Sequence, residues 1–225
     1  MLREFDVDAN VGRPQVAYKE TVAGTAKAEG RYIKQTGGSG DYGVVKLEVS
    51  SAPAGSGFHF ENATKGGVIP KEFMAAVEQG CREAAESGEL AGYPVVDLRV
   101  RILDGQTHEV DSSERSFKIA ASMGMREAMQ LAGPTLLEPF MDVEVVTPEE
   151  FVGAVQGDLN SRRANITGIE MRAGAQVISC TAPLSEMFGY VNSLRSMTQG
   201  RASYTMQFSH YEAVPESVVN QIVGR

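Results

Sequence analysis

Alternating apolar and polar residues predict several strands in the first half of the chain. Residues 43–51 alternate as a half-buried strand does, and residues 20–35 are also extended. Together these two segments predict a long hairpin whose end is the glycine-rich loop 36–43. A short strand is expected at 58–61, and residues 95–103 place valine, leucine and isoleucine on one face of a further strand.

Two helices are predicted in the same half. Pro70 stands where a helix best tolerates a residue without an N–H, and apolar residues then recur at helical spacing as far as Ser87-Gly88. A second helix is expected over 114–131. Ser113 offers the hydroxyl of its N-cap, and Gly133-Pro134 ends it.

The second half of the chain shows the order βαββαβ, which is the split-βαβ or ferredoxin-like arrangement. Its expected elements are a strand at 141–146, a helix at 148–159, strands at 164–171 and 176–182, a helix at 184–196 and a strand at 203–211.

We therefore predict an α+β protein with two domains in series, over 22–136 and 137–225. Residues 1–21 contain a period-two pattern at 5–11 that ends at Gly12-Arg13-Pro14. One strand cannot fold by itself, so this segment is expected to be the remnant of a preceding domain or an N-terminal strand that needs a partner.

Composition indicates an ordinary globular protein, with 42% hydrophobic and 22% charged residues. No apolar run approaches the length of a membrane-spanning helix, and the N-terminus lacks the apolar segment of a secretory signal. Cys81 and Cys180 lie far apart without metal-ligand spacing, which is typical of buried thiols in a reducing compartment. We expect a cytoplasmic protein that has no contact with membranes.

The net charge of −8 counts against a nucleic-acid binder that uses a broad basic surface. Taken alone, it favours a function that does not involve nucleic acid. It leaves open a protein that touches RNA at a few points, or one that approaches an assembly through protein contacts.

Two connections attract attention as candidate contact regions. Residues 103–114 join a predicted strand to a predicted helix, with Asp104-Gly105 as a turn dipeptide. The loop 36–43 has no lysine where a Walker loop requires one, and it opens a strand where a Rossmann fingerprint would open a helix. A flexible hairpin turn is the simpler alternative for it. We expect both connections at the same end of one domain, where they form a tip that reaches into a nucleic-acid site.

Side chains at this tip suit hydrogen bonds with sugar, phosphate and base edges. The alternative is a solvated polar loop with a helix cap. The candidate contact residues are Gly37, Gly38, Ser39, Gly40, Asp41, Tyr42, Gln106, Thr107, His108, Asp111, Ser112 and Ser113.

Catalysis and metal binding are not expected. A serine, a histidine and an aspartate this close in sequence rarely reach the geometry of a catalytic triad, so no catalytic residue is assigned. No metal site is assigned either, because His59 and His210 have no ligand-like neighbours.

Basic residues in the second domain gather at the ends of its two predicted helices. They are suited to phosphate contact through the forked guanidinium, and equally to complementing the helix dipole. The candidate residues are Arg162, Arg163, Arg195, Gln199 and Arg201.

The run 189–204 closely resembles the C-terminal domain of elongation factor G, the translocation GTPase. Other motifs resemble the same family, and together they cover essentially the whole chain. They are Gly157 to Arg163, Ala182 to Phe188, His108 to Glu114, Val7 to Gly12 and Pro14 to Tyr18.

This resemblance implies the fourth and fifth domains of the factor with the tail of its third. The fourth domain of the family has a ribosomal-protein-like βαβ fold with a left-handed crossover, and it enters the decoding region of the small subunit while tRNA and mRNA move. His108 resembles the histidine at the tip of that domain. The fifth domain of the family contacts large-subunit RNA and protein.

The partners implied are thus the ribosome, with the RNA of both subunits, ribosomal proteins and the mRNA–tRNA pair. We expect a monomer without a cofactor of its own. GTP and Mg²⁺ belong to the GTPase domain, which this chain lacks, so the chain is expected to be non-enzymatic and either an excised fragment or a truncated protein.

The glycine-rich loop departs from the family, whose members usually have Gly-Gly-Arg-Gly-Gln-Tyr-Gly-His. Here Ser39 replaces the arginine, Asp41 the glutamine and Val44 the histidine. Losing a cation and gaining an anion weakens contact with phosphate. A divergent paralogue that serves ribosome recycling or protection is therefore an alternative, as is a stand-alone protein-interaction module.

Overall fold

The computed structural model describes residues 15–34 and 40–224, and these residues form two compact units. Residues 18–137 and 211–224 make up the first unit, and residues 15–17 and 138–210 the second. Residues 18–21, which the sequence assigned to a preceding domain, thus pack in the first unit. The strand predicted at 5–11 lies outside the described residues. No helix among the described residues is long and apolar enough to cross a membrane.

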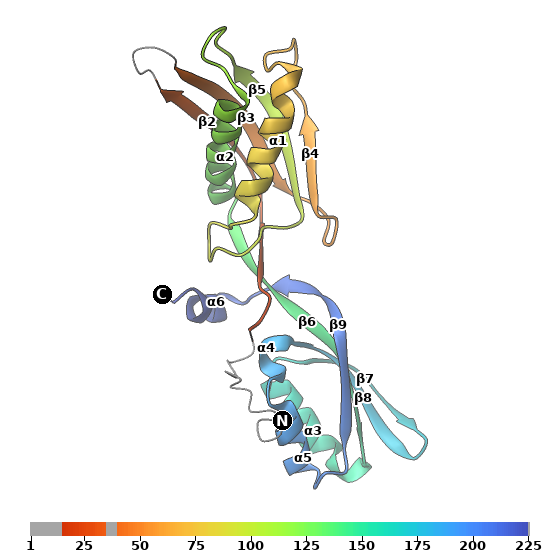
Figure 1. The fold of residues 1–225 in the computed structure, drawn as a ribbon. Helices are drawn as coiled ribbons and strands as arrows, with labels where there is room; N and C mark the ends of the chain where they lie inside the picture. Colours follow the sequence, from red (N-terminus) through yellow and green to blue (C-terminus); the bar gives the residue numbers. More distant parts are fainter. Residues whose placement is uncertain (1–14, 35–39, 225) are drawn as a thin grey trace, which may run out of the picture. The chain divides into compact units, whose positions relative to one another are not determined.

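The first unit is a four-stranded sheet with two helices on one face (Figure 1). The sheet order is β2-β3-β5-β4, in which β2, β3 and β5 are antiparallel neighbours and β4 runs parallel to β5. The elements are β2 (Thr25–Lys34), β3 (Asp41–Ser51), β4 (Phe58–Asn62), α1 (Lys71–Ala85), β5 (Leu98–Gln106) and α2 (Glu114–Leu131).

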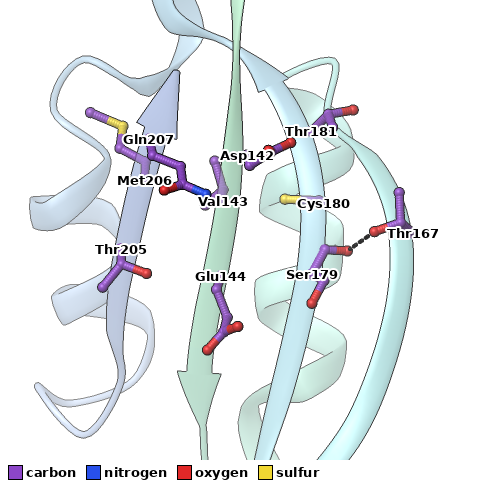
Figure 2. A pocket seen from close by; sticks show the side chains of 10 residues that line it. All are labelled: Asp142, Val143, Glu144, Thr167, Ser179, Cys180, Thr181, Thr205, Met206 and Gln207. Atoms are coloured by element: carbon purple, nitrogen blue, oxygen red, sulfur yellow. Dashed lines mark hydrogen bonds between the residues drawn. The ribbon is translucent and has the colours of Figure 1, made fainter. Parts of the chain in front are cut away.

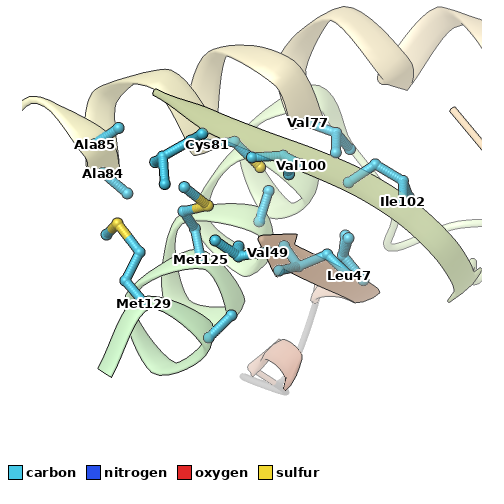
Figure 3. Close-up of a cluster of buried hydrophobic side chains, with 14 of the residues drawn as sticks. Leu47, Val49, Val77, Cys81, Ala84, Ala85, Val100, Ile102, Met125 and Met129 are labelled. Atoms are coloured by element: carbon cyan, nitrogen blue, oxygen red, sulfur yellow. The ribbon is translucent and has the colours of Figure 1, made fainter. Parts of the chain in front are cut away.

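Apolar side chains from both layers of the first unit form its core (Figure 3). Leu47 on β3, Ile102 on β5, Val77 on α1 and Met125 on α2 are each 0% exposed. Burial of such a side chain stabilises a fold by about 1.5–3 kcal/mol. This core fixes the strands and helices whose ends carry the candidate contact residues.

Both predicted helices of the first unit are confirmed. Pro70 occupies the N-cap position of α1. Ser113 caps α2 through a reciprocal capping box, in which its hydroxyl accepts from the Ser116 N–H while its own N–H donates to Ser116 Oγ. The start of α2, and with it the connection from β5, is therefore fixed by local hydrogen bonds.

The prediction of a turn at Asp104-Gly105 is wrong, because β5 runs on to Gln106. Asp104 pairs with Lys46 and Gly105 with Val45, after a bulge in the pairing. A Cβ at Gly105 would lie 2.4 Å from Cγ1 of Ile69. The glycine thus permits close packing within a strand, where the sequence suggested a chain reversal.

A further strand, β1 (Lys19–Val22), pairs with the beginning of β6 (Pro134–Thr147). The Glu20 side chain on β1 is fully buried, and its carboxylate accepts N–H groups of Leu90 (3.0 Å), Ala91 (2.8 Å) and Tyr93 (3.2 Å). These bonds attach the loop after α1 to the strand that leads into the unit.

The second unit has the predicted ferredoxin-like order, and the α+β class is confirmed for both units. Its sheet order is β9-β6-β8-β7, and α3 and α5 lie on one face (Figure 1). The elements after β6 are a 3-10 turn η1 (Glu149–Phe151), α3 (Val152–Ser161), β7 (Asn165–Arg172), β8 (Ala175–Pro183), α4 (Leu184–Met187), α5 (Tyr190–Met197) and β9 (Ser203–Ala213).

Two local predictions in this half need correction, and one helix was not predicted. The helix expected at 184–196 is interrupted, because Phe188 is extended (ψ 127°) and Gly189 is left-handed (φ 74°). β6 begins at Pro134, seven residues before the predicted strand at 141, because its first four residues pair with β1. A C-terminal helix, α6 (Glu216–Val223), follows Pro215 and was not predicted.

Candidate nucleic-acid interface

The end of the β2–β3 hairpin and the β5–α2 connection are joined by hydrogen bonds. The Tyr42 N–H donates to the Asp111 carbonyl oxygen (2.8 Å), and the Gly40 N–H donates to Asp111 Oδ1 (2.9 Å). Within the described residues, the end of the hairpin and this connection therefore lie against each other. We call residues 40–42 and 106–113 the tip.

Serine hydroxyls lock the beginning of α2 to β3. Ser112 Oγ and Ser116 Oγ both donate to the Tyr42 carbonyl oxygen, at 2.9 and 3.0 Å. A Cβ at Gly43 would lie 2.8 Å from the Ser116 carbonyl oxygen, so only glycine permits this approach of strand to helix. Ser112 and Ser113 therefore contribute to the construction of the tip.

His108 lies on the exposed side of the tip with its side chain 53% accessible. Its Nδ1 lies 3.3 Å from Asp111 Oδ2, and the N–H groups of Val110 and Asp111 point to the same nitrogen at 3.4 and 3.3 Å. The imidazole is 5.9 Å from the Tyr42 ring, between centroids. Two rings thus stand side by side at the surface of the tip.

The remaining side chains of the tip are mostly exposed. Tyr42 Oη donates to Gln106 Oε1 (3.0 Å), while Thr107 and Glu109 face solvent. Val110 is 81% exposed, which the sequence analysis did not single out. The sequence carries no signal for it, because single exposed apolar residues are common on protein surfaces.

Charge at the tip is acidic. Asp41, Glu109 and Asp111 lie within it, and it contains no lysine or arginine. Contact with nucleic acid here must therefore depend on ring surfaces, hydrogen bonds and shape, because the tip offers no cation to phosphate. Gly37, Gly38 and Ser39, also predicted contacts, lie outside the described residues.

One row of charges on the open face of the same sheet is neutralised by ion pairs within the row. Lys27, Glu48, Arg101 and Glu61 occupy one cross-strand row and form ion pairs of 3.1–3.6 Å. Cations held in this way have carboxylate partners already, so this face is less suited than a free basic patch to phosphate binding.

A catalytic arrangement is absent from the described part of the tip. Ser112 Oγ donates to a backbone carbonyl and accepts from the His108 backbone N–H (2.9 Å), so the imidazole does not activate it. Among the described residues no group of histidine, cysteine and carboxylate side chains could hold a metal ion.

Two of the predicted arginines in the second unit are engaged within it. Arg162 donates to Asp158 Oδ2 (2.7 Å) and to the Glu186 carbonyl oxygen (2.6 Å), and it lies over the Tyr190 ring. Arg163 pairs with Glu138, whose side chain is 1% exposed. These contacts favour a structural role, and a role of either arginine in RNA binding stays a prediction.

The other three candidates in this unit lie at the exposed C-terminal end of α5. Arg195 is exposed and has no ion-pair partner among the described residues, and Gln199 is exposed with a left-handed backbone (φ 54°). Arg201 pairs with Glu150 and lies over the Phe151 ring. Arg195 is thus the cation of this group most available to a phosphate.

A shallow hollow of about 400 Å³ lies on the open face of the second sheet (Figure 2). Asp142, Thr181 and Ser179 contribute polar groups, and Glu144, which also lines the hollow, forms an ion pair with Arg172 (3.1 Å). The hollow combines hydroxyl groups with carboxylates and lacks a basic residue, so it does not suit a phosphate-bearing ligand.

Comparisons with known proteins agree with this architecture. The family model described as elongation factor G, domain IV, matches residues 14–133, and the model described as elongation factor G C-terminus matches residues 135–222. A crystal structure of a protein from Thermus thermophilus is similar to the chain, with a TM-score of 0.87 and 41% identity over 99% of the chain. The match covers 33% of the Thermus protein, so the chain spans about a third of that relative's length.

Proposed function

The chain belongs to the elongation factor G family, of which it carries domain IV and the C-terminal domain, and from this premise we propose that it is a ribosome-binding portion of a translocase. Its tip enters the decoding region of the small subunit while tRNA and mRNA move. The observation that carries this proposal is the joining of the two connections by Asp111, which exposes His108 and Val110 at one end of a rigid unit.

The mechanism proposed is mechanical. The tip occupies space that a tRNA vacates, and a sheet with two packed helices gives it the stiffness to do so. The second unit binds large-subunit RNA and protein, with Arg195 and Arg201 as phosphate contacts. GTP and Mg²⁺ act in the GTPase domain of the parent factor, and the chain works in the cytoplasm as a monomer.

Recognition at the two ends differs in chemistry. The tip has carboxylates and rings, so it suits base edges and ribose hydroxyl groups. The α5 end of the second unit has guanidinium groups, so it supplies the salt-dependent part of binding. We therefore expect the tip to determine placement and the second unit to contribute electrostatic affinity.

Co-sedimentation of the full chain with purified ribosomes at low and moderate salt tests the proposal. His108→Ala should weaken binding, whereas His59→Ala should not, because His59 is exposed on β4 and lies outside the tip. Arg195→Ala should reduce the salt dependence of binding, with Arg99→Ala, an exposed arginine of the first unit, as its control. Failure of the unsubstituted chain to bind ribosomes would overturn the proposal.

A specialised paralogue that serves recycling or protection is the second candidate. It is favoured by Ser39, Asp41 and Val44, where the family usually has arginine, glutamine and histidine. Val44 is 0% exposed, so it replaces a polar side chain by a buried apolar one. If the loop meets RNA, Ser39→Arg should strengthen ribosome association at low salt in a protein that also has its GTPase domain. Unchanged association would argue that this loop makes no RNA contact.

A further inference from the structure

We propose that Asp111 is the positioning residue of the tip: its carboxylate holds the β2–β3 hairpin and the β5–α2 connection together and orients His108 towards nucleic acid. The inference rests on the proposed function, because it explains how the tip is prepared for contact. Asp111 itself is only 20% exposed, although the neighbouring Glu109 and Val110 face solvent.

Each oxygen of the carboxylate serves a different segment. Oδ1 accepts the Gly40 N–H at 2.9 Å, and Oδ2 lies 3.3 Å from His108 Nδ1. The backbone of the same residue adds two contacts, since its carbonyl oxygen accepts the Tyr42 N–H and its own N–H points to His108 Nδ1. Asp111 therefore contacts both sides of the tip through main chain and side chain.

Glycine at position 40 is required by this arrangement. A Cβ on Gly40 would lie 2.9 Å from both Cγ and Oδ2 of Asp111, a separation shorter than side chains tolerate. The carboxylate can approach the hairpin only because position 40 has no side chain.

The orientation of His108 follows from the same contacts. Nδ1 faces the carboxylate and the two N–H groups, so the opposite edge of the ring, with Nε2, is the edge left for a ligand. No described residue bonds to Nε2. The contact with Oδ2 is a hydrogen bond when Nδ1 carries the proton, and the Tyr42 ring lies beside the imidazole with its centroid 5.9 Å away.

A tip ordered in advance loses less conformational freedom on binding than two free loops do. Releasing one side chain and one loop end should weaken ribosome binding by about tenfold, which corresponds to about 1.4 kcal/mol. Stability should change little, because the side chains involved lie at the surface end of the unit.

Charge and positioning predict opposite effects, which makes the test sharp. Asp111→Asn and Glu109→Gln each remove one negative charge, and the two positions are only two residues apart. If only charge mattered, both would strengthen binding to RNA. Positioning predicts that Asp111→Asn weakens binding by about tenfold while Glu109→Gln leaves it equal or stronger. Asparagine keeps one oxygen for Gly40, but the NH₂ group that it then turns to His108 cannot accept the Nδ1–H that Oδ2 accepts.

A double-mutant cycle identifies the route of the effect. If Asp111 acts through His108, then Asp111→Asn should weaken binding no further in a chain that already carries His108→Ala. Affinities for purified ribosomes should be measured on the full chain, with circular dichroism of each variant to confirm folding. NMR of the Gly40 amide should show a large shift in Asp111→Ala, which removes both oxygens.

The outcomes separate the two proposals. The positioning role is overturned if Asp111→Asn binds ribosomes as tightly as the unsubstituted chain. It is also overturned if the loss of affinity from Asp111→Asn adds fully to the loss from His108→Ala. Ribosome binding itself stays intact in both cases. Absence of ribosome binding by the unsubstituted chain would overturn the proposed function, and the role in nucleic-acid contact with it. An unchanged Gly40 amide in Asp111→Ala would contradict the contact itself.

Discussion

Glu20→Ala should destabilise the first unit substantially, although Glu20 takes no part in the tip. Its carboxylate is fully buried and binds three backbone N–H groups, of Leu90, Ala91 and Tyr93. Alanine would leave these three donors without their acceptor. The loop would lose its three bonds to the Glu20 side chain, while the backbone bonds of Glu20 with Pro94 and Val96 and the pairing of β1 with β6 would remain.

The magnitude follows from the number of donors. A buried donor left without a partner costs about 1–3 kcal/mol, and we use the lower end because the three residues are half-buried and water can reach them after truncation. Glu20→Ala should therefore cost about 3 kcal/mol. Glu20→Gln keeps one acceptor oxygen and places an NH₂ group against an N–H, so about half of that loss is expected.

Reactivity of the Cys81 thiol provides an assay specific to this unit. Cys81 is 0% exposed, and its burial, with Glu78 nearby, raises its pKa to about 12, so labelling requires opening of the unit. A loss of about 3 kcal/mol should accelerate labelling by about 150-fold, and the glutamine variant should show about tenfold. Mass spectrometry of the Cys81 peptide distinguishes it from Cys180 in the other unit.

Two controls accompany the measurement. Glu127→Ala removes an exposed glutamate from α2 and should change labelling by less than about threefold. The Cys180 labelling rate should stay the same in Glu20→Ala, because that cysteine lies in the other core cluster. A Cys81 rate in Glu20→Ala within about threefold of the unsubstituted chain would refute the account of Glu20.

Three other substitutions test packing and pairing. Tyr190→Phe should raise thermal stability by an amount equivalent to about 1 kcal/mol, because the buried Tyr190 hydroxyl, whose pKa burial raises, has no hydrogen-bond partner among the described residues; a lower melting temperature would contradict this. Gly30→Ala should destabilise by more than about 3 kcal/mol in urea titrations, since its Cβ would lie 1.8 Å from the Ala120 carbonyl oxygen, whereas Gly153→Ala, in open space on α3, should be tolerated. Arg163→Ala should cost about 3 kcal/mol in the same titrations by leaving buried Glu138 without its ion pair, and an unchanged midpoint would argue against that pair.

Local signals in the sequence were sufficient for most elements. The helix predicted at about 114–131 is confirmed, because Ser113 and Gly133-Pro134 mark its ends. The hairpin of β2 and β3 and the order of the second unit followed from hydrophobic periodicity. These features depend on neighbours within a few residues, which a single sequence records.

The errors arose where distant residues decide the local conformation. Asp104-Gly105 is a common turn pair, yet Gly105 stays in a strand because Ile69 packs against it. Likewise β6 begins early because β1, more than 100 residues away, pairs with it.

The candidate site shows the same division. His108 and Tyr42 were found from residue type and from the family resemblance. The Asp111 carboxylate contacts both Gly40 and His108, and its bond to Gly40 joins residues that are 71 positions apart in the sequence. The charges of Arg162 and Arg163 suggested phosphate binding, and only the structure showed the internal partners Asp158 and Glu138. The positions of charged residues along the sequence do not show which side chains they will form ion pairs with in the fold.

Directed cleavage of ribosomal RNA from the tip tests the central claim most directly. Val110→Cys places a thiol at a residue that is 81% exposed, while the native cysteines are buried, so an iron–EDTA group can be attached selectively. Met171→Cys, 68% exposed in the second unit, is the matched control. With the chain bound to ribosomes, cleavage from position 110 is predicted in small-subunit RNA of the decoding region, and cleavage from position 171 elsewhere. Bound chain that cleaves no decoding-region RNA from position 110 would contradict the account.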